Sequence, residues 1–221
     1  MKQLFLIILL IAGVACHAQD TLSNWSFGAL LGFDRQYRVL NAENSLSGTA
    51  EDWDDLESAA WRISGGLKVQ WSPFKRFSIS TGITYIDRGY KIDSLKDARL
   101  HGLEYHFRYV DIPLCIHYTG TESKKNRLFA GVGINTSIAV SNVLQYQKNG
   151  QTAQFEMEAE SEIRPILLNV SASLGIRRSI TNNATVDLYL NGIQSLKSHA
   201  DGPLERRFNS VGLFVSILNR F

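Results

Sequence analysis

Apolar and polar residues alternate along most of the chain with a period of two, which predicts β-strands. In the first such segment one parity is held by Trp25, Phe27, Ala29, Leu31 and Phe33. Comparable apolar stripes recur over residues 61–71, 77–85, 110–118, 128–138, 166–176, 184–190 and 211–221. The pattern therefore predicts an all-β fold of about eight strands, an allowed even number for a closed antiparallel up-and-down barrel.

The connections between these segments alternate in length. Three of them are short and rich in turn residues, namely 72–76, 119–127 and 179–183. Four others are longer, namely 35–60, 89–106, 141–163 and 195–207. Short turns at one end and long loops at the other are typical of transmembrane barrels.

The charged residues decide between a soluble barrel and a barrel in lipid. A soluble barrel would place its apolar parity inside, whereas a membrane barrel places its charges there. A charge facing lipid at the midplane costs about 2–4 kcal/mol, so the polar parity is expected to line the lumen. These lumen charges are Arg62, Lys68, Asp111, Arg177, Asp187 and Arg220. Because the interior of an eight-strand barrel is just filled by side chains, we expect ion pairs and not a wide pore; a narrow proton or ion path is the alternative.

Aromatic residues frame the apolar stripes. Trp61 and Trp71 are ten residues apart, which covers about 33 Å of strand, or about 25 Å of height at a tilt of about 40°. That height matches the apolar band between the aromatic girdles of a membrane barrel. Phe221 ends the last alternating strand, so it is expected to be the signal that the barrel-assembly machinery reads.

Residues 1–18 have the features of an export signal. Lys2 precedes an apolar stretch over 4–15, and small residues before Gln19 predict cleavage between Ala18 and Gln19. A membrane anchor is excluded because the stretch is too short. Lipidation of Cys16 remains an alternative, since a small residue precedes it. Cleavage leaves a barrel domain over 19–221, in which Cys115 is expected to be a buried apolar residue.

Composition and spacing give little support for other functions. The net charge is +2 without a clustered basic face, so no nucleic-acid partner is expected. No cofactor or metal is expected either. The acidic segment 51–57 lacks EF-hand spacing and indicates solvated charge, with calcium binding as the alternative. The glutamates of 156–162 recur at strand spacing and indicate an exposed strand face, with divalent cations near lipopolysaccharide headgroups as the alternative.

No catalytic residue is predicted, because the histidines that could act in the outer loops have no defining spacing. The candidates for a membrane-embedded hydrolase or acyltransferase are His101, His106, His199 and Asp201. A tight rim cluster of one histidine with an acid or serine would favour that enzyme, and dispersed histidines would favour a binding protein.

Parity also predicts the turn at Asn149-Gly150. With a two-residue turn, each even-numbered residue of one strand would face an odd-numbered residue of the other. The apolar stripes that contain Ile134 and Ile166 are both even-numbered, so one of them would then turn into the lumen. A three-residue turn of Lys148, Asn149 and Gly150, or a compensating β-bulge, is therefore expected.

The segment YVDIPLCIHY, residues 109–118, resembles the hallmark of a bacterial outer-membrane β-barrel family that includes PorT-like proteins. LFAGVGINTSIAV, residues 128–140, and YLNGI, residues 189–193, resemble its later strands, and the terminal Phe fits as well. Asp111 and His117 stand where that family usually has Glu and Lys. The resemblance implies a barrel of about eight strands without catalysis, and some members act in protein secretion.

Together these features lead us to expect a small outer-membrane protein of a Gram-negative bacterium, with both termini in the periplasm. Its expected partners are outer-membrane lipid and lipopolysaccharide, the barrel-assembly machinery, and a secretion or surface protein.

Overall fold

The computed structural model of the protein describes residues 24–42, 56–94, 101–120, 125–148, 151–156, 164–198 and 204–220. Nine strands lie in these segments: β1 (Trp25–Ala42), β2 (Glu57–Trp71), β3 (Phe77–Ser94), β4 (His101–Thr119), β5 (Asn126–Lys148), β6 (Gln151–Glu156), β7 (Ile166–Ser179), β8 (Ala184–Ser195) and β9 (Leu204–Arg220). Helices long and apolar enough to cross a membrane are absent from the described segments.

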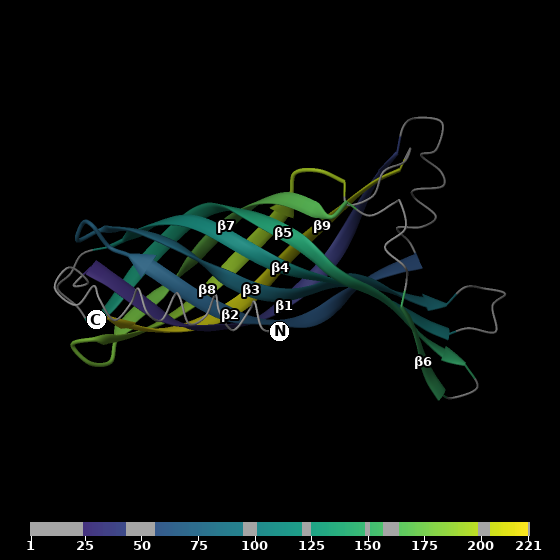
Figure 1. The fold of residues 1–221 in the computed structure, drawn as a ribbon, viewed down its shortest axis with the longest axis horizontal. Helices are drawn as coiled ribbons and strands as arrows, with labels where there is room; N and C mark the ends of the chain where they lie inside the picture. The colour runs from purple at the N-terminus through teal and green to yellow at the C-terminus, as the bar shows by residue number, and fades with distance from the viewer. Residues whose placement is uncertain are drawn as a thin grey trace, which may run out of the picture.

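Eight of the strands form a closed ring. Each pairs antiparallel with its neighbours in the order β1-β2-β3-β4-β5-β7-β8-β9, and β9 pairs with β1. The remaining strand, β6, pairs with β5 and continues it as a hairpin beyond the barrel (Figure 1). The predicted closed antiparallel barrel of about eight strands is confirmed.

The two faces of the wall follow the predicted parities. Leu67 and Leu128 are 67% and 66% exposed on the outside, whereas their neighbours Lys68 and Phe129 are buried inside. Aromatic pairs mark the limits of the apolar band: Trp25 stacks on Trp71 near one end. Toward the other end Phe33 stacks on Trp61, with ring centroids 4.8 Å apart.

The strands run farther than the sequence predicted. β1 extends to Ala42, β3 to Ser94 and β5 to Lys148, into segments that were expected to be long loops. Beyond the apolar band no lipid imposes alternation, but backbone groups still gain by pairing, so strands continue without their sequence signature. We call the part formed by 57–59, 90–94, 101–107, 142–148 and 151–156 the outer sheet.

The predicted three-residue turn is wrong. Lys148 pairs with Gln151, so the β5–β6 hairpin has a two-residue connection, and the backbone of Asn149 and Gly150 is outside the described residues. The facing assignment is nevertheless right, because Ile134 pairs with Val170 farther down. The parity conflict does not arise, since β6 is a separate strand and β5 pairs with β7 only from Ile138 downward.

Candidate functional site

The lumen holds one charge cluster in the half near the chain ends. Arg177 and Asp187 are cross-strand neighbours on β7 and β8, and Arg177 donates to both Asp187 oxygens, Nε at 2.7 Å and Nη2 at 2.8 Å. Nη2 also donates to Gln70 Oε1 at 2.7 Å. Lys68 Nζ lies 3.7 Å from Asp187 Oδ2, so one carboxylate serves two cations. We call these four residues the lower charge cluster.

Aromatic side chains enclose this cluster. Phe129, Tyr189 and Phe214 pack together across the barrel as a buried apolar group. The Arg177 guanidinium lies 5.4 Å from the Phe129 ring centroid, and Lys68 Nζ lies 5.2 Å from that of Tyr189. These ring faces attract cations and exclude water, which strengthens the ion pairs beside them.

A second lumen cluster lies higher in the barrel. Arg88 Nη2 donates to Asp111 Oδ2 at 2.9 Å and to Ser137 Oγ at 3.2 Å. Asp34, which accepts from Gln36, is buried at the same level of the wall. Arg88 is not marked as inward by the sequence pattern, because the alternation of apolar and polar residues stops near Tyr85. Asp34 could have been found, since it continues the inward parity of β1.

An apolar group closes the outer end of the lumen. We call it the aromatic cap; it consists of Tyr90, Ile92, Leu103, Phe107, Tyr109, Leu167 and Phe208. Phe107 of β4 and Phe208 of β9 meet across the barrel with ring centroids 5.2 Å apart. Between this cap and the lower charge cluster lies a cavity of about 70 Å³. That volume has room for a few water molecules.

Arg38 ties the aromatic cap to the outer sheet. Its Nη1 donates to Tyr90 Oη at 3.0 Å, its guanidinium lies 3.8 Å from the ring centroid, and its Nε donates to Glu57 at 2.8 Å. Burial lowers the pKa of Arg38 to about 10 and raises the pKa of Tyr90 to about 12. Arg38 is therefore charged and Tyr90 neutral at pH 7, as the geometry requires.

A third charge cluster, the rim cluster, lies on the outer face just beyond the aromatic belt. His106 Nδ1 lies 2.6 Å from Asp87 Oδ2, and Glu104 contacts Arg62 and, at 3.3 Å, Lys91. Burial raises the pKa of Glu104, but the hydrogen bond and charge of Arg62 outweigh it, so the net shift is downward. Arg62 reaches these partners where the β2–β3 register shifts, between Ala59 and Gly65.

The predicted lumen charges lie in three different environments. Lys68, Asp111, Arg177 and Asp187 are buried inside the barrel. Arg62 is buried as well, but its partners Asp87 and Glu104 have the outward parity of Tyr85 and Ile112. Arg220, at the end of β9, is exposed at the mouth of the barrel.

The other candidate residues are only partly described. Cys115 faces the lumen with Sγ 3.9 Å from Ser171 Oγ, which fits a small interior residue. Among the candidate catalytic side chains, that of His106 is described, and those of His101, His199 and Asp201 are not. Several predictions concern positions outside the described residues: the signal cleavage site and its alternative, Ala18, Gln19 and Cys16, the terminal Phe221, and most of the two acidic segments, 51–55 and 157–163. Within the part that is described, no group of three or more His, Cys, Asp and Glu residues is placed to hold a metal ion.

Three solved structures that align with this chain have little sequence in common with it. Neisserial surface protein A, NspA, aligns with a TM-score of 0.50 and 10% identity, over 90% of this chain and 98% of that one. Ail, the attachment invasion locus protein of Yersinia pestis, aligns with a TM-score of 0.39 and 9% identity, over 87% of this chain and 97% of that one. The outer-membrane protease OmpT of Escherichia coli aligns with a TM-score of 0.45 and 8% identity, over 91% of this chain and 98% of that one.

Sequence comparison settles the family. No curated protein matches the chain by sequence. Residues 17–198 match the family described as outer membrane protein beta-barrel domain, which is most of the chain. Together with the closed ring of eight antiparallel strands, this match shows that the chain belongs to the outer membrane protein beta-barrel domain family.

Proposed function

We propose that this protein is a closed, non-enzymatic barrel whose outer sheet binds a protein partner at the cell surface. The observation that carries the proposal is the contrast between the two parts of the molecule. The lumen is filled by two charge clusters and closed by the aromatic cap. The strands nevertheless continue well beyond the apolar band, where a barrel that served only as a membrane anchor needs none.

The outer sheet has a surface suited to a partner strand. β6 pairs with β5 along one edge, and no described strand pairs with its other edge. An unpaired edge presents backbone N–H and C=O groups that an extended peptide can bind by strand addition. Phe155 on this strand is 61% exposed and supplies an apolar anchor next to that edge.

Photo-crosslinking tests this proposal. A photo-reactive phenylalanine analogue at Phe155 is expected to form a discrete protein adduct in intact cells, because the edge of β6 would contact the partner. The same analogue at Thr181, which is exposed in the turn at the opposite end, serves as the control. Identical adduct patterns from both positions, or lipid adducts alone from Phe155, would contradict the proposal.

The remaining parts of the proposal concern orientation and partners. We propose that the start of β1 and the end of β9 lie at the periplasmic side, since the short turns lie at that end of the barrel and short turns are periplasmic in this class of barrel. The aromatic belt around Trp61 and Tyr85 would then contact lipopolysaccharide. The belt at the other limit of the apolar band, which contains Trp25 and Trp71, would contact phospholipid. Phe221 is proposed as the signal for the barrel-assembly machinery. The resemblance to PorT-like proteins makes a component of protein secretion the first partner to test.

The His106 and Asp87 pair is the one observation that favours an enzyme, since a histidine oriented by a carboxylate is a common general base. Two features argue against it. His106 Nε2, the atom that would take a proton, is buried and has no hydrogen-bond partner among the described residues, with Glu104 Oε1 3.8 Å away. The pair is also surrounded by Arg62, Glu104 and Lys91, an ion-pair network that balances its charges.

We therefore expect that neither the wild type nor His106→Gln hydrolyses substrate, and that His106→Gln costs about 1 kcal/mol of stability, the typical value of one hydrogen bond. The measurement is hydrolysis of fluorogenic peptide and phospholipid substrates by the purified protein in detergent, with Glu104→Gln as a control in the same cluster. Turnover by the wild type that His106→Gln abolishes and Glu104→Gln retains would establish the enzyme instead.

A further inference from the structure

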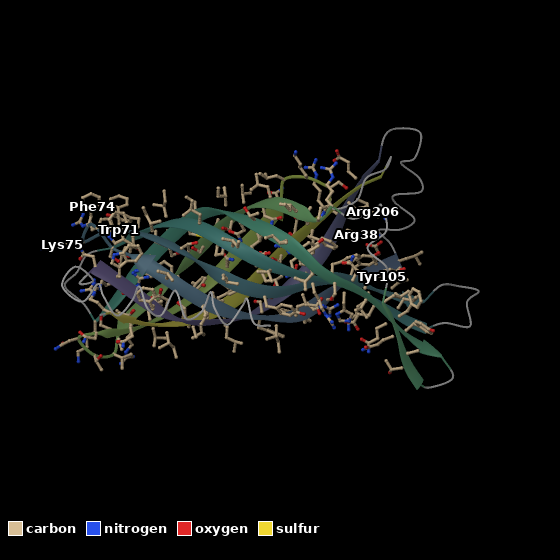
Figure 2. All side chains as sticks on the ribbon, viewed as in Figure 1. Arg38, Trp71, Phe74, Lys75, Tyr105 and Arg206 are labelled. Carbon is tan, nitrogen blue, oxygen red and sulfur yellow. The ribbon has the colours of Figure 1, made fainter. Side chains whose placement is uncertain are left out.

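A second, larger cavity opens at the end of the barrel where β1 begins and β9 ends. Its volume is about 380 Å³, and we call it the vestibule. Residues of the turns 72–76 and 179–183 form its rim, and inward side chains of the neighbouring strands form its walls. Lys75, Phe74 and Trp71 lie at this end of the molecule, opposite Arg38, Tyr105 and Arg206 (Figure 2).

The vestibule is strongly basic. Its cationic lining residues are Lys75, Arg76, Arg127, Arg177 and Arg220. No aspartate or glutamate is among the described residues that line it. Asp187, behind the floor, is already shared by Arg177 and Lys68. The wall is therefore an electrostatic environment that favours an anion.

Arg127 and Arg220 are the residues best placed to bind one. Arg127 is half-buried in the wall, and its Nη2 donates to Ser179 Oγ at 3.3 Å. Its Nε is buried with no hydrogen-bond partner among the described residues, which leaves an unsatisfied charged donor. Arg220 lines the same cavity from β9, and Asn182 and Asn183 add amide groups beside it. All of these groups are hydrogen-bond donors that line one cavity.

The vestibule is closed at its inner end. Arg177 and Gln70 meet there, and the aromatic group of Phe129, Tyr189 and Phe214 lies behind them. A ligand that enters from the mouth can therefore bind but cannot pass through the barrel. This geometry is that of a binding pocket and not of a transport path.

We propose that the vestibule binds a phosphate ester, held chiefly by Arg127 and Arg220. The planar guanidinium fork matches phosphate oxygens with two parallel hydrogen bonds, and the serine, threonine and asparagine groups of the wall complete the shell. The cavity is large enough for a phosphate and several further heavy atoms. Such a group can come from a lipid headgroup at the mouth or from a soluble phosphate compound.

Calorimetric titration with inorganic pyrophosphate tests the site, using the mature barrel in an uncharged detergent at low salt. Saturable binding is expected for the wild type. Arg127→Gln and Arg220→Gln are each expected to weaken it about tenfold or more, the effect of losing a charge-assisted hydrogen bond. Arg178→Gln is the matched control, because Arg178 follows Arg177 directly but is exposed on the outer face. Circular dichroism checks that each variant retains its β-structure.

Nanodiscs distinguish the two sources. If a lipid headgroup fills the vestibule, phosphatidylglycerol in the nanodisc competes with pyrophosphate and raises the unfolding temperature of the wild type but not of Arg127→Gln. If the natural ligand is soluble, the lipid leaves pyrophosphate binding unchanged. Equal pyrophosphate binding by the wild type, Arg127→Gln and Arg178→Gln would overturn the proposal, as would a wild type that responds to neither pyrophosphate nor phosphatidylglycerol.

Discussion

Asp187→Asn is expected to lower the free energy of unfolding by about 3–5 kcal/mol, the usual cost of removing one partner from a buried ion pair. Asp187 is fully buried, and among the described residues it is the carboxylate that Arg177 and Lys68 both contact. Asparagine keeps the shape of the side chain but leaves two cations next to each other without a counter-charge. Denaturant unfolding of the barrel in lipid vesicles, followed by tryptophan fluorescence, measures the change.

A triple variant separates the charge effect from the packing effect. Removing all three charges together, as Lys68→Met, Arg177→Met and Asp187→Asn, is expected to recover most of the lost stability, since no unpaired charge remains. A cost below about 1 kcal/mol for Asp187→Asn alone would mean that water screens the lower charge cluster, as it does at a surface.

Among substitutions on the lipid-facing surface of the barrel, Leu67→Arg has the largest expected effect. It is expected to lower the free energy of unfolding by about 2–4 kcal/mol. Leu67 lies between Trp61 and Trp71 on β2, near the middle of the apolar band, and is exposed on the outer face. A guanidinium there would lose its hydration to lipid unless it bent toward a headgroup. Folding yield into vesicles and denaturant unfolding report this loss.

Leu128→Arg provides the matched control. Leu128 is as exposed as Leu67 and faces outward as well, but it lies near the end of β5, beside the mouth of the barrel. An arginine at that depth reaches the headgroups, so the expected cost is about 0–1 kcal/mol. Equal losses from the two variants would show that the lipid band is not where the tryptophan pairs place it.

The sequence predicted the part of the fold that lipid constrains. Between the aromatic belts every second residue must be apolar, so the parities of Leu67, Leu128 and their neighbours could be assigned before the structure was known. Past Tyr85 and Arg35 this constraint ends, and the outer sheet and the inward Arg88 carried no periodic signal. The turn prediction failed for a related reason: it assumed one continuous ladder, whereas β6 is a separate strand.

For the candidate site, the sequence predicted which side of the barrel wall each side chain faces, but not which side chains contact each other. Parity indicates that Arg177 and Asp187 point inward, but their pairing depends on the β7–β8 register, which aligns them directly. Arg62 shows the limit most clearly. Its parity is inward, yet the interrupted β2–β3 ladder lets its side chain join Glu104 on the outer face. Nor does alternation show that Arg127 and Arg220 line one cavity, since that follows from the closure of the ring.

The seam between β1 and β9 has a consequence for the order of folding. It pairs Ser26 with Arg220 at one end and Ala42 with Leu204 at the other, in a ladder without a register shift. Contacts between residues so far apart in the chain carry a large loop-closure entropy and form slowly. The hairpins from β2 to β8 can assemble from local pairings, so we expect the seam to close last. Until it does, two long strand edges stay open, and the nascent chain needs protection from aggregation during that interval.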